Sequence, residues 1–177
     1  MKAKINYQTE LDRIISSIPQ GETPTLMLHS CCAPCSSYVL EYLSRYFKIT
    51  VFYYNPNIYP EDEFYKRRSE QERFISLLPA EKPVKFIGSD HFSQDFYEAV
   101  KGLEHIPEGG ERCFACYRLR LEATAKAAAE NGADYFTTTL SISPHKNAEK
   151  LNEIGSGTLN RCIERNTLST LANIEIT

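Results

Sequence analysis

The stretch Thr25-Leu26-Met27-Leu28-His29-Ser30-Cys31-Cys32-Ala33-Pro34-Cys35 decides the fold that we predict for this chain. It opens on a short apolar run that is typical of a buried strand, and an amphipathic run begins near Ser36. The cysteines between the two runs therefore lie on a strand-to-helix turn. In an open parallel sheet such a turn lies at the carboxyl ends of the strands, where ligands bind.

A second cysteine motif, Cys113-Phe114-Ala115-Cys116, follows later, and the two motifs together contain five of the six cysteines. Cys113 and Cys116 are three residues apart, so on a helix both sulfurs share a face and can reach one metal ion. Cys31 and Cys32 are adjacent, and both can bind one centre only if the backbone bends sharply between them. The clustering indicates a site.

The cysteines allow three interpretations. Isolated free cysteines are often small buried apolar residues, but two dense motifs argue against that role. A disulfide framework is disfavoured because the chain is long enough to form a core and shows no secretory signal. A four-thiolate metal site remains, and the spacing leaves zinc and iron–sulfur chemistry both open.

Length and composition predict one domain, since the chain has 177 residues of which 42% are hydrophobic. No apolar stretch is long enough to cross a bilayer, and the N-terminus lacks the apolar segment of a signal peptide. We therefore expect a cytoplasmic protein without membrane contact, in which thiols stay reduced and free to bind metal.

The net charge of −3 provides no overall attraction to nucleic acid, so any such contact must come from local basic groups. The candidates are Lys66-Arg67-Arg68 and, beside the second cysteine motif, Arg112, Arg118 and Arg120. A solvated helix face is the competing interpretation.

Periodicity predicts strands that alternate with helices. Strands are expected at residues 25–28, 49–54, 84–87 and 135–140. Helices are expected at residues 7–18, 35–47, 62–78, 94–103, 117–130 and 144–154. This alternation predicts an α/β fold with a doubly wound, Rossmann-like parallel sheet. The positive end of a helix that begins near Cys35 would favour a thiolate there.

The sequence changes character at Gly155. Ser156-Gly157-Thr158 is expected to end the last helix, and the residues beyond it show only a weak apolar pattern. We predict a single α/β domain over residues 1–155, with an N-terminal helix, and a weakly structured tail over residues 156–177.

Four motifs carry a resemblance to a known family. They are Leu28-His29-Ser30-Cys31-Cys32-Ala33-Pro34-Cys35-Ser36, Phe52-Tyr53-Tyr54-Asn55-Pro56-Asn57-Ile58, Glu111-Arg112-Cys113-Phe114-Ala115-Cys116-Tyr117-Arg118-Leu119-Arg120 and Phe136-Thr137-Thr138-Thr139-Leu140-Ser141-Ile142-Ser143-Pro144. Together they resemble the QueH-type epoxyqueuosine reductases, from about Pro24 to Gly155. The resemblance implies a fold similar to the adenine nucleotide alpha hydrolases, with the cysteine turn in place of their Gly-rich phosphate loop.

The resemblance also implies a cofactor. Cys31, Cys32, Cys113 and Cys116 would be the ligands of a [4Fe–4S] cluster in an iron–sulfur catalytic domain. An additional mononuclear iron would lie beside the cluster, and Cys35 would contribute to that second site.

The implied reaction is the last step of queuosine synthesis, in which epoxyqueuosine at the wobble position of a tRNA anticodon is reduced to queuosine. An iron–sulfur centre relays the electrons from an unidentified donor, and an iron with an open position can bind the epoxide oxygen. A base in a single-stranded loop can stack on aromatic side chains and be held by Arg or Lys at its phosphates. Candidate contacts are Tyr53, Tyr54, Tyr117 and Arg118, and candidate proton carriers are Asp90, His91 and His145.

The chain departs from that family after Gly155. Family members normally continue into a further strand, more helix and a terminal Cys-Gly-Cys pair thought to be redox-active, whereas the tail here contains one cysteine, Cys162. A truncation or a change of reading frame at Gly155 would keep the four cluster ligands and impair turnover that depends on the terminal pair.

Two other functions compete with the reductase. A zinc-stabilised nucleic-acid-binding module without redox activity is the main alternative, and metal analysis separates it from the reductase. An ATP-dependent nucleotide-modifying enzyme of the related fold is disfavoured because the phosphate loop is missing.

Overall fold

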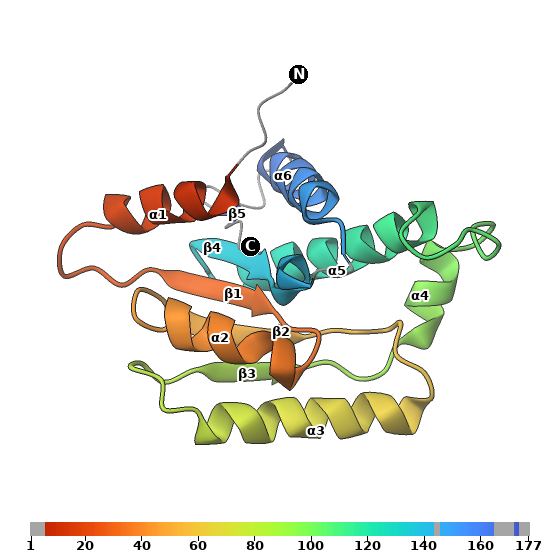
Figure 1. The fold of residues 1–177 in the computed structure, drawn as a ribbon, viewed down its shortest axis with the longest axis horizontal. Helices are drawn as coiled ribbons and strands as arrows, with labels where there is room; N and C mark the ends of the chain where they lie inside the picture. Colours follow the sequence, from red (N-terminus) through yellow and green to blue (C-terminus); the bar gives the residue numbers. More distant parts are fainter. Residues whose placement is uncertain (1–5, 144–145, 165–171, 174–177) are drawn as a thin grey trace.

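The central feature of the fold is a parallel sheet, shown in Figure 1 for a computed structural model that describes residues 6–143, 146–164 and 172–173. In spatial order the strands are β3 (Lys85–Gly88), β2 (Lys48–Tyr53), β1 (Thr25–His29), β4 (Tyr135–Thr138) and β5 (Ala172–Asn173). The helices are α1 (Tyr7–Ser17), α2 (Ala33–Leu43), α3 (Glu61–Leu77), α4 (Ser93–Ala99), α5 (Glu111–Glu130) and α6 (Ala148–Glu164), with a 3-10 turn η1 (Thr139–Ile142) after β4. The predicted α/β, Rossmann-like class is confirmed.

The strand order places a topological switch point beside β1. The chain proceeds outward from β1 through β2 to β3 and then returns to the other side of β1 as β4. Connections at the carboxyl ends of β1 and β4 therefore leave in opposite directions, and a crevice at such a point is where open α/β sheets bind ligands. The first cysteine turn follows β1 at this point, and η1 follows β4.

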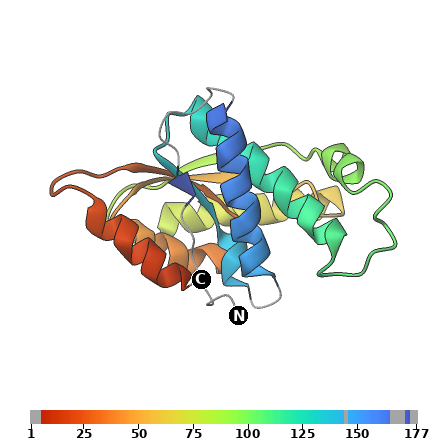
Figure 2. The ribbon, with the colours of Figure 1, turned by 90° about the horizontal axis from the view of Figure 1, so that it is seen from above.

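Helices cover both faces of the sheet (Figure 2), and alternation along the strands divides the core between these two faces. Leu26 and Leu28 of β1 pack with α1 and α2, whereas Met27 faces the other way, toward α5. The second cluster contains ten buried residues: Met27, Tyr117, Leu121, Ala125, Ala127, Ala128, Phe136, Leu140, Leu151 and Ile154. We call this set the α5 cluster, because α5 provides half of its members.

The long helix α5 begins earlier than predicted, at Glu111 rather than near Tyr117, so it includes the second cysteine motif. The helix ends at Glu130, as expected, and Asn131 is its C-terminal cap. Gly132 has a φ of 61°, and the amide of Ala133 donates back to the carbonyl of Ala128 at 2.9 Å.

The predicted end of the last helix is wrong. Helix α6 continues through Gly155 and Gly157 to Glu164, although a glycine within a helix costs about 1 kcal/mol relative to alanine. Ile154, Gly155 and Thr158 are buried, so tertiary packing outweighs the local preference of the glycines. The proposed division at residue 155 into domain and tail stays a prediction.

Two smaller differences affect the site edge and the tail. Strand β4 ends at Thr138 rather than at residue 140, because the Thr138 hydroxyl caps the amide of Leu140 and starts η1. A short strand, β5, occupies Ala172–Asn173, where no element was expected.

Within the described part of the chain, no helix is long and apolar enough to cross a membrane.

Candidate metal centre

His29, the last residue of β1, ties together three segments at the carboxyl edge of the sheet. It is fully buried, and burial together with the positive charge of Arg120 lowers its pKa to about 3. The neutral ring donates from Nε2 to the carbonyl of Tyr54 (3.1 Å). Its Nδ1 therefore accepts from the hydroxyl of Thr138 (2.9 Å), which fixes the tautomer.

Beyond His29, the backbone turns and gathers three cysteine sulfurs. Cys32 is the N-cap of α2 in an extended conformation (φ −174°, ψ 163°), and Pro34 lies in the first turn of the helix. The sulfurs of Cys31, Cys32 and Cys35 all lie within 4.8 Å of one another, with 3.8 Å between those of Cys31 and Cys32. The sharp bend that adjacent ligands require is therefore present.

Polar residues from three other elements hold this turn. The hydroxyl of Thr139 in η1 contacts both the amide (3.2 Å) and the sulfur (3.4 Å) of Cys31. Asn55, in the loop after β2, donates to the carbonyl of Ser30 at 2.8 Å. The hydroxyls of Ser30 and Ser36 both donate to Gln71 Oε1 of α3, at 2.8 and 3.2 Å. The geometry of the turn thus depends on the whole sheet edge.

The second cysteine pair lies in the first two turns of α5. Cys113 Sγ accepts a hydrogen bond from the amide of Gly109 at 3.3 Å, and Cys116 is buried. Cys113 and Cys31 pack against the same α5 cluster, so both motifs lie at the α5 side of the sheet. The close group of three sulfurs does not include Cys113 or Cys116.

The three clustered thiols differ in acidity. Contact with Cys32 lowers the pKa of Cys31, but contact with Cys35 and burial outweigh this and leave it raised. Contact with Cys31 and burial raise the pKa of Cys32. The hydrogen bond from Cys31 lowers the pKa of Cys35, and the positive charge of Lys146 acts in the same direction. Cys35 is therefore the thiol of this group that ionises most readily.

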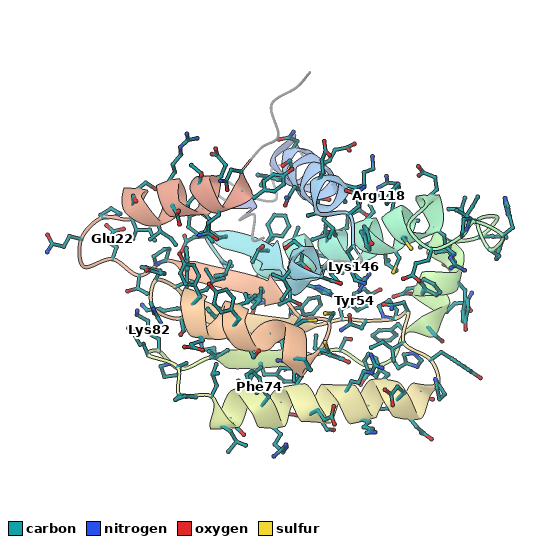
Figure 3. All side chains as sticks on the ribbon, viewed as in Figure 1. Glu22, Tyr54, Phe74, Lys82, Arg118 and Lys146 are labelled. Carbon is teal, nitrogen blue, oxygen red and sulfur yellow. The ribbon has the colours of Figure 1, made fainter. Side chains whose placement is uncertain are left out.

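Two side chains lie between the motifs. Figure 3 shows Tyr54 and Lys146 between α2 and α5. Lys146 interacts electrostatically with Cys35, and Tyr54 does so with Cys116. The Tyr54 hydroxyl donates to Asp95 of α4 at 2.6 Å. Burial raises the pKa of Tyr54, and this hydrogen bond raises it further.

The donor set fits a soft metal centre. Thiolates select zinc, Cu(I) and iron–sulfur clusters over hard cations, and the three clustered sulfurs are only partly exposed. The hydrogen bonds that the sulfurs make with the Thr139 hydroxyl and the Gly109 amide resemble those that surround metal-bound thiolates. The site can therefore hold a thiolate-bound metal or cluster.

Residues 26–168 match the family described as Epoxyqueuosine reductase QueH. This chain belongs to the QueH family. The match continues beyond Gly155, where we expected the family pattern to end.

Curated members of the QueH family share a substantial part of this sequence. The Staphylococcus epidermidis protein is 45% identical over 157 residues, which cover 86% of this chain and 66% of that protein. The Streptococcus pyogenes protein is 41% identical over 159 residues, covering 86% and 61%. The Thermotoga maritima protein is 33% identical over 134 residues, covering 74% and 66%. All three are named Epoxyqueuosine reductase QueH, and this chain spans less than two thirds of the length of each.

Other residues that we considered from the sequence fall into distinct environments in this QueH chain. Tyr53, Tyr54 and Tyr117 are buried, so they do not offer exposed rings for stacking, and Arg118 is exposed. Arg120 is buried, so neither a surface contact with nucleic acid nor a solvated helix face, the two interpretations that we left open, describes it.

The remaining candidates make local contacts. Arg67 pairs with Glu63 at 2.6 Å, and Asp90 pairs with Arg68 at 3.6 Å. His91 donates from Nε2 to the carbonyl of Ile58 at 2.8 Å and so joins two loops. His145 lies outside the described residues, as does the side chain of Cys162.

Sequence reasoning missed several residues that shape the site. They are His29, Asn55, Gln71, Thr139 and Lys146. A signal existed for three of them, because His29, Asn55 and Thr139 are polar residues within two positions of a strand end. Gln71 lies within helix α3, where no local pattern distinguishes it.

Proposed function

We propose that this chain binds a [4Fe–4S] cluster through Cys31, Cys32, Cys113 and Cys116 and reduces epoxyqueuosine to queuosine in tRNA. The observation that supports this most strongly is the gathering of three sulfurs at the switch point of the sheet, in a chain of the QueH family. Packing of Cys31 and Cys113 against one apolar cluster supports joint ligation by both motifs. The reaction belongs to the cytoplasm, where tRNA is found and thiols stay reduced.

The overall reaction requires two electrons and two protons, since the epoxide becomes an alkene and its oxygen leaves as water. A cluster held by Cys31, Cys32, Cys113 and Cys116 would supply the electrons singly, from an unidentified donor. We propose that Cys35 contributes to an adjacent mononuclear iron, because its sulfur lies within 4.8 Å of those of Cys31 and Cys32 and its thiolate is favoured.

The protein residues have separate roles in this proposal. Thr139 and Asn55 hold the turn that carries the first pair of ligands. Lys146 supplies positive charge beside Cys35, where a developing oxyanion or a phosphate can be stabilised. His29 stays neutral and keeps the end of β1 aligned with Tyr54 and Thr138.

The partner in this proposal is the anticodon loop of a tRNA. Its unpaired bases can leave the stack and bind between aromatic side chains, and its phosphates can contact basic groups. Exposed rings follow the carboxyl ends of β2 and β3 at Tyr59, Phe92 and Tyr97, and Arg118 is exposed on α5. These elements surround the edge that carries Cys31.

We also retain the proposal that the fold is related to that of the adenine nucleotide alpha hydrolases.

Anaerobic iron and sulfide reconstitution tests the proposal. We expect about four irons and four sulfides per chain with broad visible absorption, as a cubane cluster requires, and an iron excess if the second site fills. Cys31→Ala and Cys113→Ala should each abolish the absorption, whereas Cys162→Ala, outside both motifs, should not. Incubation of the reconstituted protein with a chemical reductant and epoxyqueuosine-containing tRNA should yield queuosine, detected by mass spectrometry of the digested tRNA.

Two results would count against this function. A chain that binds only zinc, and in which zinc raises the unfolding temperature, would favour the zinc-stabilised nucleic-acid-binding module. A chain that holds the cluster but yields no queuosine would separate metal binding from turnover, and the reductase assignment would fail for this form.

A further inference from the structure

Arg120 is a buried cation beside the candidate metal centre. It lies on α5, one turn after Cys116, and its side chain is 4% exposed. Its Nε donates to the carbonyl of Cys116 at 3.2 Å, and its guanidinium carbon lies 5.9 Å from the centre of the Tyr117 ring. Across the described residues, no carboxylate lies within 4 Å of its guanidinium nitrogens.

The guanidinium lies close to both Cys116 and His29. It donates a hydrogen bond to the backbone carbonyl of Cys116. It also interacts electrostatically with His29, which lies two residues before Cys31. A histidine side chain is neutral or positively charged, so His29 provides no compensating charge. Asp95, a carboxylate that reaches this edge, accepts instead from the Tyr54 hydroxyl at 2.6 Å.

A buried charge without an opposite partner is strongly unfavourable, because desolvation costs several kcal/mol. One carbonyl and one aromatic ring compensate only part of that cost. The groups that can supply negative charge at this position are the cysteine thiolates. Four thiolates around a [4Fe–4S]²⁺ core or a Zn²⁺ ion have a formal net charge of about −2, which a neighbouring cation stabilises.

We propose that Arg120 is the counter-cation of the cysteine-bound centre and that its charge raises the reduction potential of that centre. The inference rests on the proposed metal centre and adds a positioning residue to it. Reduction adds one negative charge to the cluster, and a nearby cation stabilises the more negative state. Arg120 then acts through the cluster and does not contact substrate, since it is buried.

Three variants test this assignment. Arg120→Met removes the charge and keeps most of the apolar length, Arg120→Lys retains the charge, and Arg118→Met removes an exposed charge from the same helix as a matched control. The readouts are the cluster midpoint potential by redox titration, Co²⁺ affinity from thiolate-to-cobalt absorption, and the unfolding temperature of the metal-free protein.

Arg120→Met should lower the midpoint potential and weaken Co²⁺ binding by about 10- to 100-fold. A loss of this size is typical when a residue that contacts a metal ligand is substituted. Its metal-free form should unfold at the same or a higher temperature than the unsubstituted protein, because an uncompensated buried charge has been removed. Arg120→Lys should retain most of the potential and the affinity, and Arg118→Met should leave both unchanged.

Unchanged potential and Co²⁺ affinity in Arg120→Met would overturn the assignment. The substitution Arg120→Met could also lower the unfolding temperature of the metal-free protein as much as that of the metal-bound protein. That result would overturn the assignment as well, since it indicates a purely structural role. If Arg120→Met does not fold, Arg120→Lys tests the assignment instead. A midpoint potential close to that of the unsubstituted protein supports the assignment. Loss of cluster and Co²⁺ binding, as complete as in a variant without the cysteine ligands, rejects it. Co²⁺ affinity needs no substrate, so a failed reductase assay would not alter this comparison.

Discussion

His29 is the residue at which β1, β4 and the loop after β2 are joined. Its folded pKa of about 3 lies below the ordinary value of 6.5, so between these values the unfolded chain binds a proton that the folded chain does not. Stability should therefore fall as pH decreases from about 6.5 toward 3, by about 1 kcal/mol per pH unit from this residue. Urea unfolding of the reduced, metal-free protein at pH 7, 6 and 5 measures this slope.

His29→Gln keeps hydrogen-bonding capacity without the titrating ring, so its stability should decrease less steeply over the same pH range. Equal slopes for the two proteins would show that His29 does not account for the acid sensitivity.

Gly88, the last residue of β3, is a position where any side chain would collide with a neighbour. A Cβ there would collide with Arg68 Nε and would lie 2.9 Å from a ring carbon of Phe86. Gly88→Ala should destabilise the protein by about 1–3 kcal/mol, as overpacking commonly does. Chemical denaturation measures this, and the loss should shrink in an Arg68→Ala background because the nearest obstruction is gone. Equal losses in both backgrounds would assign the effect to Phe86 or the backbone.

At the scale of elements, the loop after β2 holds the cysteine turn. Asn55 is buried and donates to the carbonyl of Ser30, directly before Cys31. Asn55→Ala leaves that buried carbonyl without this donor, so we expect a loss of about 1–3 kcal/mol in unfolding free energy and weaker Co²⁺ binding. Asn57→Ala, at an exposed position in the same loop, is the matched control. Unchanged metal affinity in Asn55→Ala would mean that the turn keeps its shape without this bond.

The exposed face of α5 provides a prediction about tRNA. Arg118 is exposed near the second cysteine motif, whereas Lys126 lies two turns further along the helix and pairs with Glu130. If Arg118 contacts a phosphate, Arg118→Ala should weaken tRNA binding severalfold and reduce the salt-dependence slope by about 1. Lys126→Ala should change neither. Filter binding over a range of salt concentrations measures both, and identical slopes for all proteins would exclude Arg118 from the interface.

At the scale of the whole molecule, a metal bound by both motifs would connect the turn after β1 to the start of α5, which lie far apart in the sequence. Metal removal should therefore lower the unfolding temperature and increase amide hydrogen exchange at both segments. Hydrogen exchange with mass spectrometry can follow residues 30–36 and 109–118 separately. Protection that changes only in residues 30–36 would restrict binding to Cys31, Cys32 and Cys35.

The sequence by itself determined the class of the fold and predicted the place of the candidate site. Strand and helix periods are local properties, and a cysteine turn between a buried strand and an amphipathic helix must lie at a sheet edge. Tertiary structure alone decided how far α6 continues, because burial of Ile154 and Thr158 outweighs the two glycines. It also decided that Cys35 lies beside Cys31 and Cys32 and that Arg120 is buried without a carboxylate among the described residues. Desolvation and charge compensation depend on which distant segments pack together, and no local pattern contains that information.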